Sequence, residues 1–539
     1  MKKLIALLLA LVMVLSLAAC GGKDEPAKEE TKEEAASTET KEEAKEETKE
    51  EAAAESGSES GRDDVIIRCE QVWYNLHPLE GIVGFPNLYI LDQVYEGLTR
   101  IDDEGVVQPR LAESWDIGSD AKTFTFKLRE GVKFHNGEEL KASDVVFTYN
   151  KACETASCDI YCNKIEKVEA TDDYTVVITL STPSVSFLNN TAEIYIFNEK
   201  YFNEVEGDML EQGVGTGPYK INTVDLSTEI TLVANEEYWE CDVPIKNVTV
   251  RAVTDSTTAA VSFEAGELDF MQVSNISAYD GLAANDSFNT TLVTTLHTAY
   301  IALNNEVAPF DNKLVRQALN YAMDRESMVA IAYEGKAEPA YLMADERAIG
   351  CDLSAASQYT YDLEKAKELL AEAGYPDGIN FTEDFGITMD IIAGGYFEKF
   401  AQVFQQSLAE MGCTIELRAS ETYSADAASG NYEIVTQGMT FTYDFAYNEG
   451  LYGTAGINSK NHARFSNATV DELFAKADAT TDNDERMGYF KEICDILADE
   501  CPTLPVLHRQ IPYAWAGELN AVPHNAVNHP YYVYEWSWN

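Results

Sequence analysis

The sequence predicts a mixed α/β fold, and three observations lead to this prediction. Runs typical of β-strands alternate irregularly with runs of helical periodicity along most of the chain. The chain from position 61 to 539 is long enough for two or three domains. No repeat with a period of roughly 20 to 50 residues indicates a solenoid or a propeller.

The predicted elements follow from local patterns, taken in chain order. β-branched or alternating runs that end at Gly, Asp or Asn predict strands at 62–69, 123–128, 174–180, 229–234 and 248–253. Apolar residues recurring every three or four positions predict helices at 314–332, 362–373, 397–411, 470–479 and 485–499. Asp362 is expected to cap the second of these helices, and Gly374 with Pro376 to end it.

The first 60 residues are predicted to lie outside this fold. The apolar run at 4–19 follows two lysines, is shorter than the ~20 residues of a membrane-spanning helix, and is typical of a signal peptide, 1–19. The run ends in Leu-Ala-Ala-Cys, which resembles a bacterial lipobox, so cleavage before Cys20 and lipid attachment to its sulfur are expected. Residues 21–60 hold 15 Asp or Glu and 6 Lys, which predicts a disordered acidic tether.

Charge and hydropathy exclude two classes of function. The net charge of −53 argues against nucleic acid as a partner, because a polyanion requires clustered Lys and Arg. The same charge is expected to keep the chain monomeric by self-repulsion. No second apolar run of about 18 or more residues follows the signal, so the body is not expected to be a channel or a permease.

The sequence contains no catalytic or metal-binding motif that we can identify. It lacks G-x-S-x-G, H-E-x-x-H and Cys-x-x-Cys, and its seven histidines are scattered. Cys153, Cys158 and Cys162 lie close together but lack the spacing of a zinc site. We therefore expect no enzymatic activity, no cofactor and no metal.

Aromatic residues give the best indication of a ligand site. Trp73, Tyr74 and Asn75 follow the first predicted strand. Later in the chain aromatic residues alternate around Asp444, at Phe441, Tyr443, Phe445 and Tyr447. Aromatic walls with a few polar groups are typical of ligand clefts, although the same alternation also fits the core of a strand.

A series of motifs runs through nearly all of 65–539. It includes YEGLTR, LAESWDI, GTGPY, FDNKLVRQALNYAMDRESMV and DLEKAKELLAEAGYPDG, at 95–100, 111–117, 215–219, 310–329 and 362–378. These motifs resemble the family 5 extracellular solute-binding proteins, the peptide- and nickel-type receptors of ABC importers. The resemblance implies a two-lobed α/β fold of the periplasmic-binding-protein type II, with an extra inserted domain.

The resemblance also implies the domain boundaries. Domain I would comprise 61–100, 211–300 and 507–539, domain II 101–210, and domain III 301–506. Extended segments near 300–304 and 505–510 would connect the lobes, and the ligand would be enclosed between domains I and III.

In peptide-binding relatives, a carboxylate in the segment around Asp444 pairs with the ligand's α-ammonium group. One placement assigns this role to Asp444. Matching Tyr447-Asn448-Glu449 to the family's Tyr-Asn-Glu instead puts Ala446 there, which would remove the anchor. The expected ligand-binding residues are Asp444, Tyr443, Phe441, Tyr447, Trp73, Tyr74 and Asn75.

The function that the resemblance implies is capture without chemistry. A lipid-anchored receptor on the outer face of the cytoplasmic membrane would enclose short peptides and deliver them to the permease of an ABC importer. The free energy of ligand binding would favour the closed form. Two alternatives stay open: a non-peptide ligand such as a nickel chelate, haem or a sugar, and a peptide-sensing receptor that is not coupled to transport.

Overall fold

A computed structural model describes residues 61–83, 85–209, 213–524 and 529–539. The predicted signal peptide, Cys20 and the predicted tether lie outside these described residues. Within them, no helix has both the length and the apolar character needed to cross a membrane.

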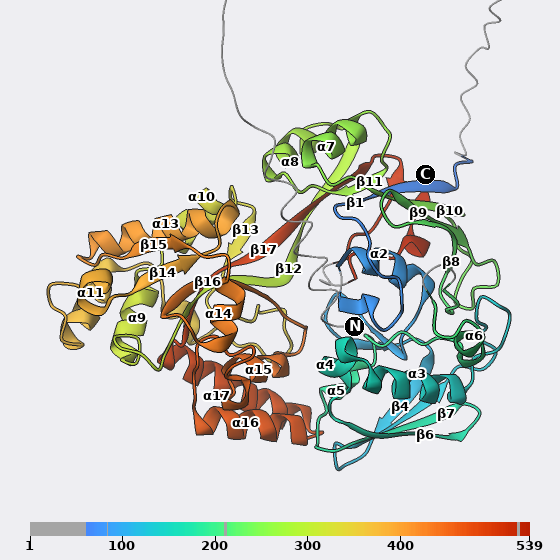
Figure 1. Cartoon of the computed structure of the whole chain (residues 1–539), viewed down its shortest axis with the longest axis horizontal. Coiled ribbons are helices and arrows are strands. Elements are labelled where there is room, and N and C mark those ends of the chain that lie inside the picture. The colour runs from blue at the N-terminus through green and yellow to red at the C-terminus, as the bar shows by residue number, and fades with distance from the viewer. Residues whose placement is uncertain (1–60, 84, 210–212, 525–528) are drawn as a thin grey trace, which may run out of the picture. The chain divides into compact units, whose positions relative to one another are not determined.

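The largest sheet joins strands from both ends of the chain (Figure 1). Its strands are β1 (Asp64–Cys69), β8 (Tyr219–Asp225), β9 (Glu229–Ala234), β10 (Asn247–Ala252), β11 (Phe270–Gln272), β12 (Phe288–Leu303), β13 (Ala337–Pro339), β14 (Thr388–Ile391), β15 (Glu416–Ala419), β16 (Ile434–Thr440) and β17 (Thr503–Ala516). Their order is β15-β14-β16-β12-β17-β11-β1-β10-β9-β8, with β13 also paired to β17. The predicted strands at 62–69, 229–234 and 248–253 are confirmed within two residues.

Two long strands, β12 and β17, form the centre of this sheet. They pair antiparallel from Phe288 opposite Ala516 to Ala302 opposite Thr503, with an irregularity between Thr294 and Thr298. The segments 300–304 and 505–510, predicted as connections between lobes, lie largely in these two strands. Both strands therefore run from the β11 side of the sheet to the β16 side.

A separate four-stranded sheet forms within the segment predicted as an insertion. Its strands are β4 (Ala112–Ile117), β5 (Thr123–Leu128), β6 (Ile165–Asp172) and β7 (Thr175–Leu180), in the order β4-β5-β7-β6. Phe124, Phe126 and Leu128 alternate along β5 and are buried, because successive side chains of a strand point to opposite faces. Helix α3 (Ala142–Glu154) packs on β6 and β7, and β2 (Thr99–Ile101), β3 (Val107–Pro109), α4 (Asp159–Cys162), α5 (Phe187–Asn190) and α6 (Glu199–Glu204) lie around this sheet.

Most of the remaining helices lie between β12 and β17 in the chain. They are α9 (Lys313–Tyr321), α10 (Arg325–Ala332), α11 (Leu363–Glu372), α12 (Phe381–Phe385), α13 (Gly395–Glu410), α14 (Tyr423–Ser429), α15 (Glu449–Tyr452), α16 (Ala468–Ala479) and α17 (Asn483–Glu500). Outside this part are α2 (Phe85–Val94), α7 (Ser256–Glu264), α8 (Ile276–Ala283) and the short strands β18 (Leu519–Asn520) and β19 (Ser537–Trp538). The predicted cap is confirmed, since the Asp362 side chain accepts a hydrogen bond from the Lys365 amide at 2.9 Å.

The prediction of one continuous helix at 314–332 is wrong. The segment forms two helices, α9 and α10, and Asp324 caps the second through the Ser327 amide at 3.0 Å. The buried Arg325 guanidinium donates to the carbonyl oxygens of Ala340 and Pro505, at 2.6 and 3.0 Å. These tertiary hydrogen bonds hold the start of α10 against distant parts of the chain, and the sequence period does not reveal them.

The helices cover both faces of the sheet around β12. Ile301 and Leu303 belong to one core, which includes Phe400 and Phe404 of α13. Tyr300 and Ala302 belong to another, which extends to Phe490 of α17. A third core joins β1 and β11 to the four-stranded sheet.

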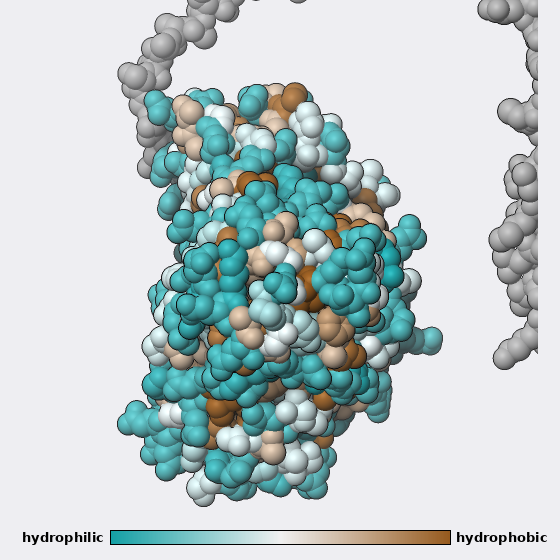
Figure 2. Space-filling model, turned by 90° about the vertical axis from the view of Figure 1, so that its left-hand side faces the viewer, coloured by the Kyte–Doolittle hydropathy of each residue, from teal (hydrophilic) through white to brown (hydrophobic). Residues whose placement is uncertain are grey.

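Polar residues dominate the surface in the view of Figure 2, where hydrophobic residues form small separate groups. The predicted boundaries of domains I, II and III stay a prediction.

Candidate functional site

A pocket of about 240 Å³ lies beside Asp444. One wall comes from 101–193 and includes Lys164, Asn189 and Glu193; the other comes from 442–478 and includes Thr442 and Tyr447. We call the part built around the four-stranded sheet and α3 to α6 the insertion lobe, and the part between β12 and β17 the helical lobe. The pocket thus lies between two lobes that are distant in sequence.

Asp444 is buried, and its carboxylate already has four hydrogen bonds. Both oxygens accept from Nη2 of Arg486 in α17 at 2.8 Å. Asn189 of α5 donates to Oδ2 at 3.0 Å, and the Ala446 amide donates to Oδ1 at 2.9 Å. An incoming ammonium group would have to displace one of these donors, and the anchor role of Asp444 stays a prediction.

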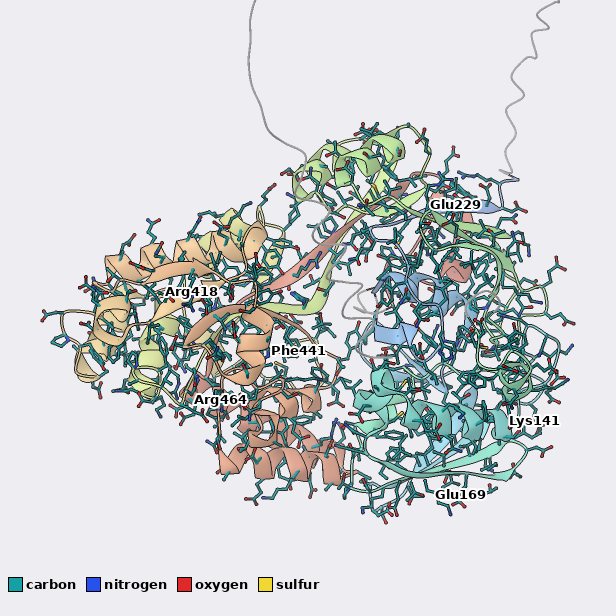
Figure 3. The ribbon with its side chains drawn as sticks, in the orientation of Figure 1. Lys141, Glu169, Glu229, Arg418, Phe441 and Arg464 are labelled. Carbon is teal, nitrogen blue, oxygen red and sulfur yellow. The ribbon has the colours of Figure 1, made fainter. Side chains whose placement is uncertain are left out.

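The aromatic stripe around Asp444 is divided between the core and the pocket. Phe441, Tyr443 and Phe445 are buried, and Figure 3 shows Phe441 on the inner side of the helical lobe. Tyr447 is partly exposed and lines the pocket. Its hydroxyl accepts a hydrogen bond from Nζ of Lys460 at 3.0 Å. Among these aromatic residues, only Tyr447 contributes to the pocket surface.

Tyr443 fixes a close approach between the lobes. Gly105, in the turn between β2 and β3, has a φ of 80° and leaves no room for a side chain. A Cβ atom at Gly105 would lie 2.5 Å from Cβ of Tyr443. The sequence alone gave no sign of this contact, because the two residues are 338 positions apart.

The structure does not bring Trp73, Tyr74 and Asn75 to this pocket. Trp73 is 3% exposed, and its indole Nε1 has no hydrogen-bond partner among the described residues. Tyr74 is 57% exposed and lines a different pocket with Asn75, Phe202 and Asp208. Their role in ligand binding stays a prediction.

A second set of contacts joins the two lobes through Asp478, near the end of α16. Its carboxylate accepts from Lys164 Nζ at 2.8 Å, Ser184 Oγ at 2.9 Å and Ser186 Oγ at 2.6 Å. The Val185 amide donates to the Asp478 carbonyl oxygen at 2.9 Å. Lys164, Ser184 and Ser186 belong to the insertion lobe, so the structure shows the lobes in contact (Figure 1).

A polar cluster on the two long strands was not found from the sequence. Arg509 of β17 donates through Nε to the Tyr333 hydroxyl at 2.7 Å. His297 of β12 lies 3.4 Å from the Tyr396 hydroxyl through Nε2 and 3.0 Å from Thr440 Oγ1 through Nδ1. Burial lowers the pKa of His297 to about 3, and the charge of Arg509 acts in the same direction, so this imidazole is neutral.

No group of three or more His, Cys, Asp or Glu side chains is arranged to hold a metal ion in the part of the chain that the structure describes. The nine cysteines of this part are free thiols. The side chains that line the pocket beside Asp444 include hydrogen-bonding and aromatic groups.

The continuous sheet, the two long connecting strands and the pocket between contacting lobes define a two-lobed solute-binding protein. The chain belongs to the bacterial extracellular solute-binding proteins of family 5, whose middle-region model matches residues 106–458. The resemblance read from the sequence and the predicted fold class are thereby confirmed. Members of this family are the substrate-binding components of ABC importers, and the homologues are not enzymes.

Two relatives that are named for different ligands align with most of this chain. Heme-binding protein A of Haemophilus influenzae is 31% identical over 457 residues, which span 77% of this chain and 82% of that protein. Glutathione-binding protein GsiB of Pectobacterium atrosepticum is 30% identical over 460 residues, which span 81% and 87%.

Solved structures show the same fold. HbpA2 of Haemophilus parasuis has a TM-score of 0.80 at 25% identity and covers 88% of this chain and 100% of its own. DppA of Helicobacter pylori, in complex with the peptide STSA, has a TM-score of 0.71 at 24% identity and covers 88% and 98%.

Proposed function

We propose that this chain captures short peptides and delivers them to the permease of an ABC importer. The observation that carries the proposal is the pocket beside Asp444, whose walls come from two lobes that hydrogen-bond to each other. A ligand in such a pocket contacts both lobes only in the closed form. Its binding therefore shifts the population toward closure.

The walls of the pocket suit a peptide. Asn189, Thr442 and Lys460 offer hydrogen-bond donors, and Thr442 and Glu193 offer acceptors. Peptide groups need both kinds of partner along their length. Tyr447 supplies an aromatic surface for a side chain. Phe441 and Tyr443 are buried and do not line the pocket, whereas Asp444 forms part of its wall.

Anchoring and location follow from the N-terminal segment. A diacylglycerol group on Cys20 would hold the protein on the outer face of the cytoplasmic membrane, since two acyl chains anchor stably where one does not. The acidic tether would let the body reach the permease. The net charge of −53 supports a monomer in solution.

Native mass spectrometry of the full-length chain tests the proposal. The chain is measured as purified, and again after unfolding, refolding and exposure to a tryptic peptide mixture. We expect retained peptides of a narrow length range. Folded protein that retains no peptide in either measurement would contradict the proposal.

One specific observation favours a second candidate. The relatives described above include proteins named for haem and for glutathione, at 31% and 30% identity. Glutathione is itself a small peptide, whereas haem is not. Retention of haem in the same experiment, without any peptide, would move the assignment to a non-peptide ligand.

A further inference from the structure

Two cysteines from distant parts of the helical lobe lie against each other. Cys351 is partly exposed in the segment between β13 and α11, and Cys494 is buried on α17. Sγ of Cys494 accepts a hydrogen bond from the amide of Asp352, the residue after Cys351, at 3.4 Å. The two thiols also hydrogen-bond to each other. The function proposed above makes no use of this pair.

Helix α17 holds the segment around Cys351 by further contacts beside the pair. Phe490 and Cys494 are four positions apart and therefore lie on one face of the helix. The ring of Phe490 packs so closely on Gly350 that a side chain at Gly350 would collide with it. Lys491 forms an ion pair with Asp352 at 3.2 Å. The approach of the two cysteines is thus set by contacts on both sides of them.

The other cysteine on the same helix is out of reach of Cys494. Cys501 caps the C-terminal end of α17 about two turns further on. A rise of about 1.5 Å per residue puts their Cα atoms about 10 Å apart, whereas bridged cysteines have Cα atoms about 4.4–6.8 Å apart. Cys351 is therefore the partner that the fold offers to Cys494.

We propose that Cys351 and Cys494 form a disulfide that staples the segment 345–352 to α17. The oxidant is a small-molecule or protein disulfide. The thiolate of Cys351, the more accessible of the two, attacks one sulfur of the oxidant, forms a mixed disulfide and releases one thiol. The thiolate of Cys494 then attacks Sγ of Cys351 and releases the second thiol. Two electrons pass from the cysteine sulfurs to the oxidant, and the two cysteine protons end on the released thiols.

The compartment and the pKa decide when this bond forms. Members of this family are extracellular, and disulfides persist there better than in the cytosol. In the folded chain the hydrogen bond with Cys494, and after it burial, raises the pKa of Cys351, so little of the reactive thiolate is present. We therefore expect the bond to form mainly during folding, before α17 covers the segment.

The staple would act on the wall of the pocket beside Asp444. The segment pairs with this wall, since the Ile349 amide donates to the Tyr443 carbonyl oxygen at 2.6 Å. The Phe445 amide donates in return to the Ile349 carbonyl oxygen at 3.0 Å. A covalent bond at Cys351, close to these two hydrogen bonds, would limit the movement of this wall.

The test uses the full-length chain refolded with a mixture of reduced and oxidised glutathione, and in parallel with a reductant alone. Folded protein is isolated by gel filtration, and its disulfides are mapped by mass spectrometry after alkylation of the free thiols. Hydrogen exchange is then measured at the Ile349 and Phe445 amides. Cys351→Ser removes the proposed bond. Cys413→Ser is the matched control, because it removes a buried thiol that accepts from the Ile379 amide at 3.2 Å.

We expect the oxidised wild type to yield a fragment pair that links Cys351 to Cys494. Exchange at the Ile349 and Phe445 amides should be at least tenfold slower than in the reduced chain. Cys351→Ser should abolish this difference, and Cys413→Ser should retain it. Cys153 and Cys162 of the insertion lobe also hydrogen-bond to each other, but a bond between them would appear in other fragments.

Two results would overturn the inference. One is folded wild type that carries no link between Cys351 and Cys494 after oxidation, or that links either of them mainly to a third cysteine. The other is a link that leaves exchange at Ile349 and Phe445 as fast as in the reduced chain, since the bond would then not staple the segment. Neither readout needs a ligand, so both results leave the proposed function intact.

Discussion

Asp444 and Arg486 form a buried ion pair whose partners are each 10% exposed. Replacing Arg486 with Met would leave the Asp444 carboxylate buried with only Asn189 and a backbone amide as donors. Breaking a buried pair in this way costs about 3–5 kcal/mol, and we expect that loss in the free energy of unfolding measured with urea. Lys476→Met removes an exposed pair with Glu472 and should leave the unfolding midpoint unchanged. Equal midpoints for the two variants would contradict this account.

Asp444 is also expected to matter for binding. Asp444→Ala removes the hydrogen bond from Asn189 and thus one contact between the lobes. Peptide affinity should fall more than tenfold, or by over ~1.4 kcal/mol, in a calorimetric titration. If the folded variant gives an unchanged isotherm, Asp444 contributes neither to peptide binding nor to closure of the lobes.

His524 makes stability depend on pH. Burial alone would lower its pKa, but hydrogen bonds to Asp103 and Glu535, at 3.0 and 2.9 Å, raise the pKa to about 9. Since its pKa in an unfolded chain is about 6.5, the stability that it contributes is complete below about pH 6.5 and lost as pH rises through about 9. His524→Gln should therefore lower the free energy of unfolding at pH 6 and have little effect at pH 10. A difference of the same size at both pH values would contradict the assignment.

At the scale of elements, the end of α16 holds the lobes together. Asp478 collects one lysine and two serine donors from the insertion lobe, and hydrogen bonds to a charged group contribute roughly 1.5–3 kcal/mol each. We expect Asp478→Ala to raise the rate of peptide release at least tenfold in stopped-flow measurements. Glu472→Ala, an exposed carboxylate on the same helix, should not change the rate. An unaltered release rate in Asp478→Ala would show that these contacts do not hold the closed form.

The same elements show how far the sequence predicts the structure. Local signals sufficed for β5 and β9, whose bounds were predicted correctly, and for the Asp362 cap. They failed at 314–332, where the chain forms two helices, Asp324 caps the second, and Arg325 donates to the distant carbonyl oxygens of Ala340 and Pro505. Periodicity carries no information about such contacts.

The candidate site was less predictable, for a related reason. Of the aromatic residues that alternate at 441–447, only Tyr447 lines the pocket, and the side-chain partners of Asp444 come from α5 and α17. The sequence contains one usable indication of the polar cluster. Arg509 is a charged residue on the face of β17 that also holds Ile511, Tyr513 and Trp515.

At the scale of the whole molecule, the central claim is that ligand binding closes the lobes across the pocket beside Asp444. The Val185 amide reports this directly, because it donates to the Asp478 carbonyl oxygen of the opposite lobe at 2.9 Å. In the open form the amide would be exposed to water. Closure should therefore slow its hydrogen exchange.

The most direct test is residue-resolved hydrogen exchange of the full-length chain, with and without a saturating peptide that mass spectrometry has identified as a ligand. We expect exchange at Val185 to slow at least tenfold, while the Gly118 amide, which bonds within the insertion lobe at 2.8 Å, exchanges at an unchanged rate. Bound peptide with unchanged exchange at Val185 would contradict ligand-driven closure.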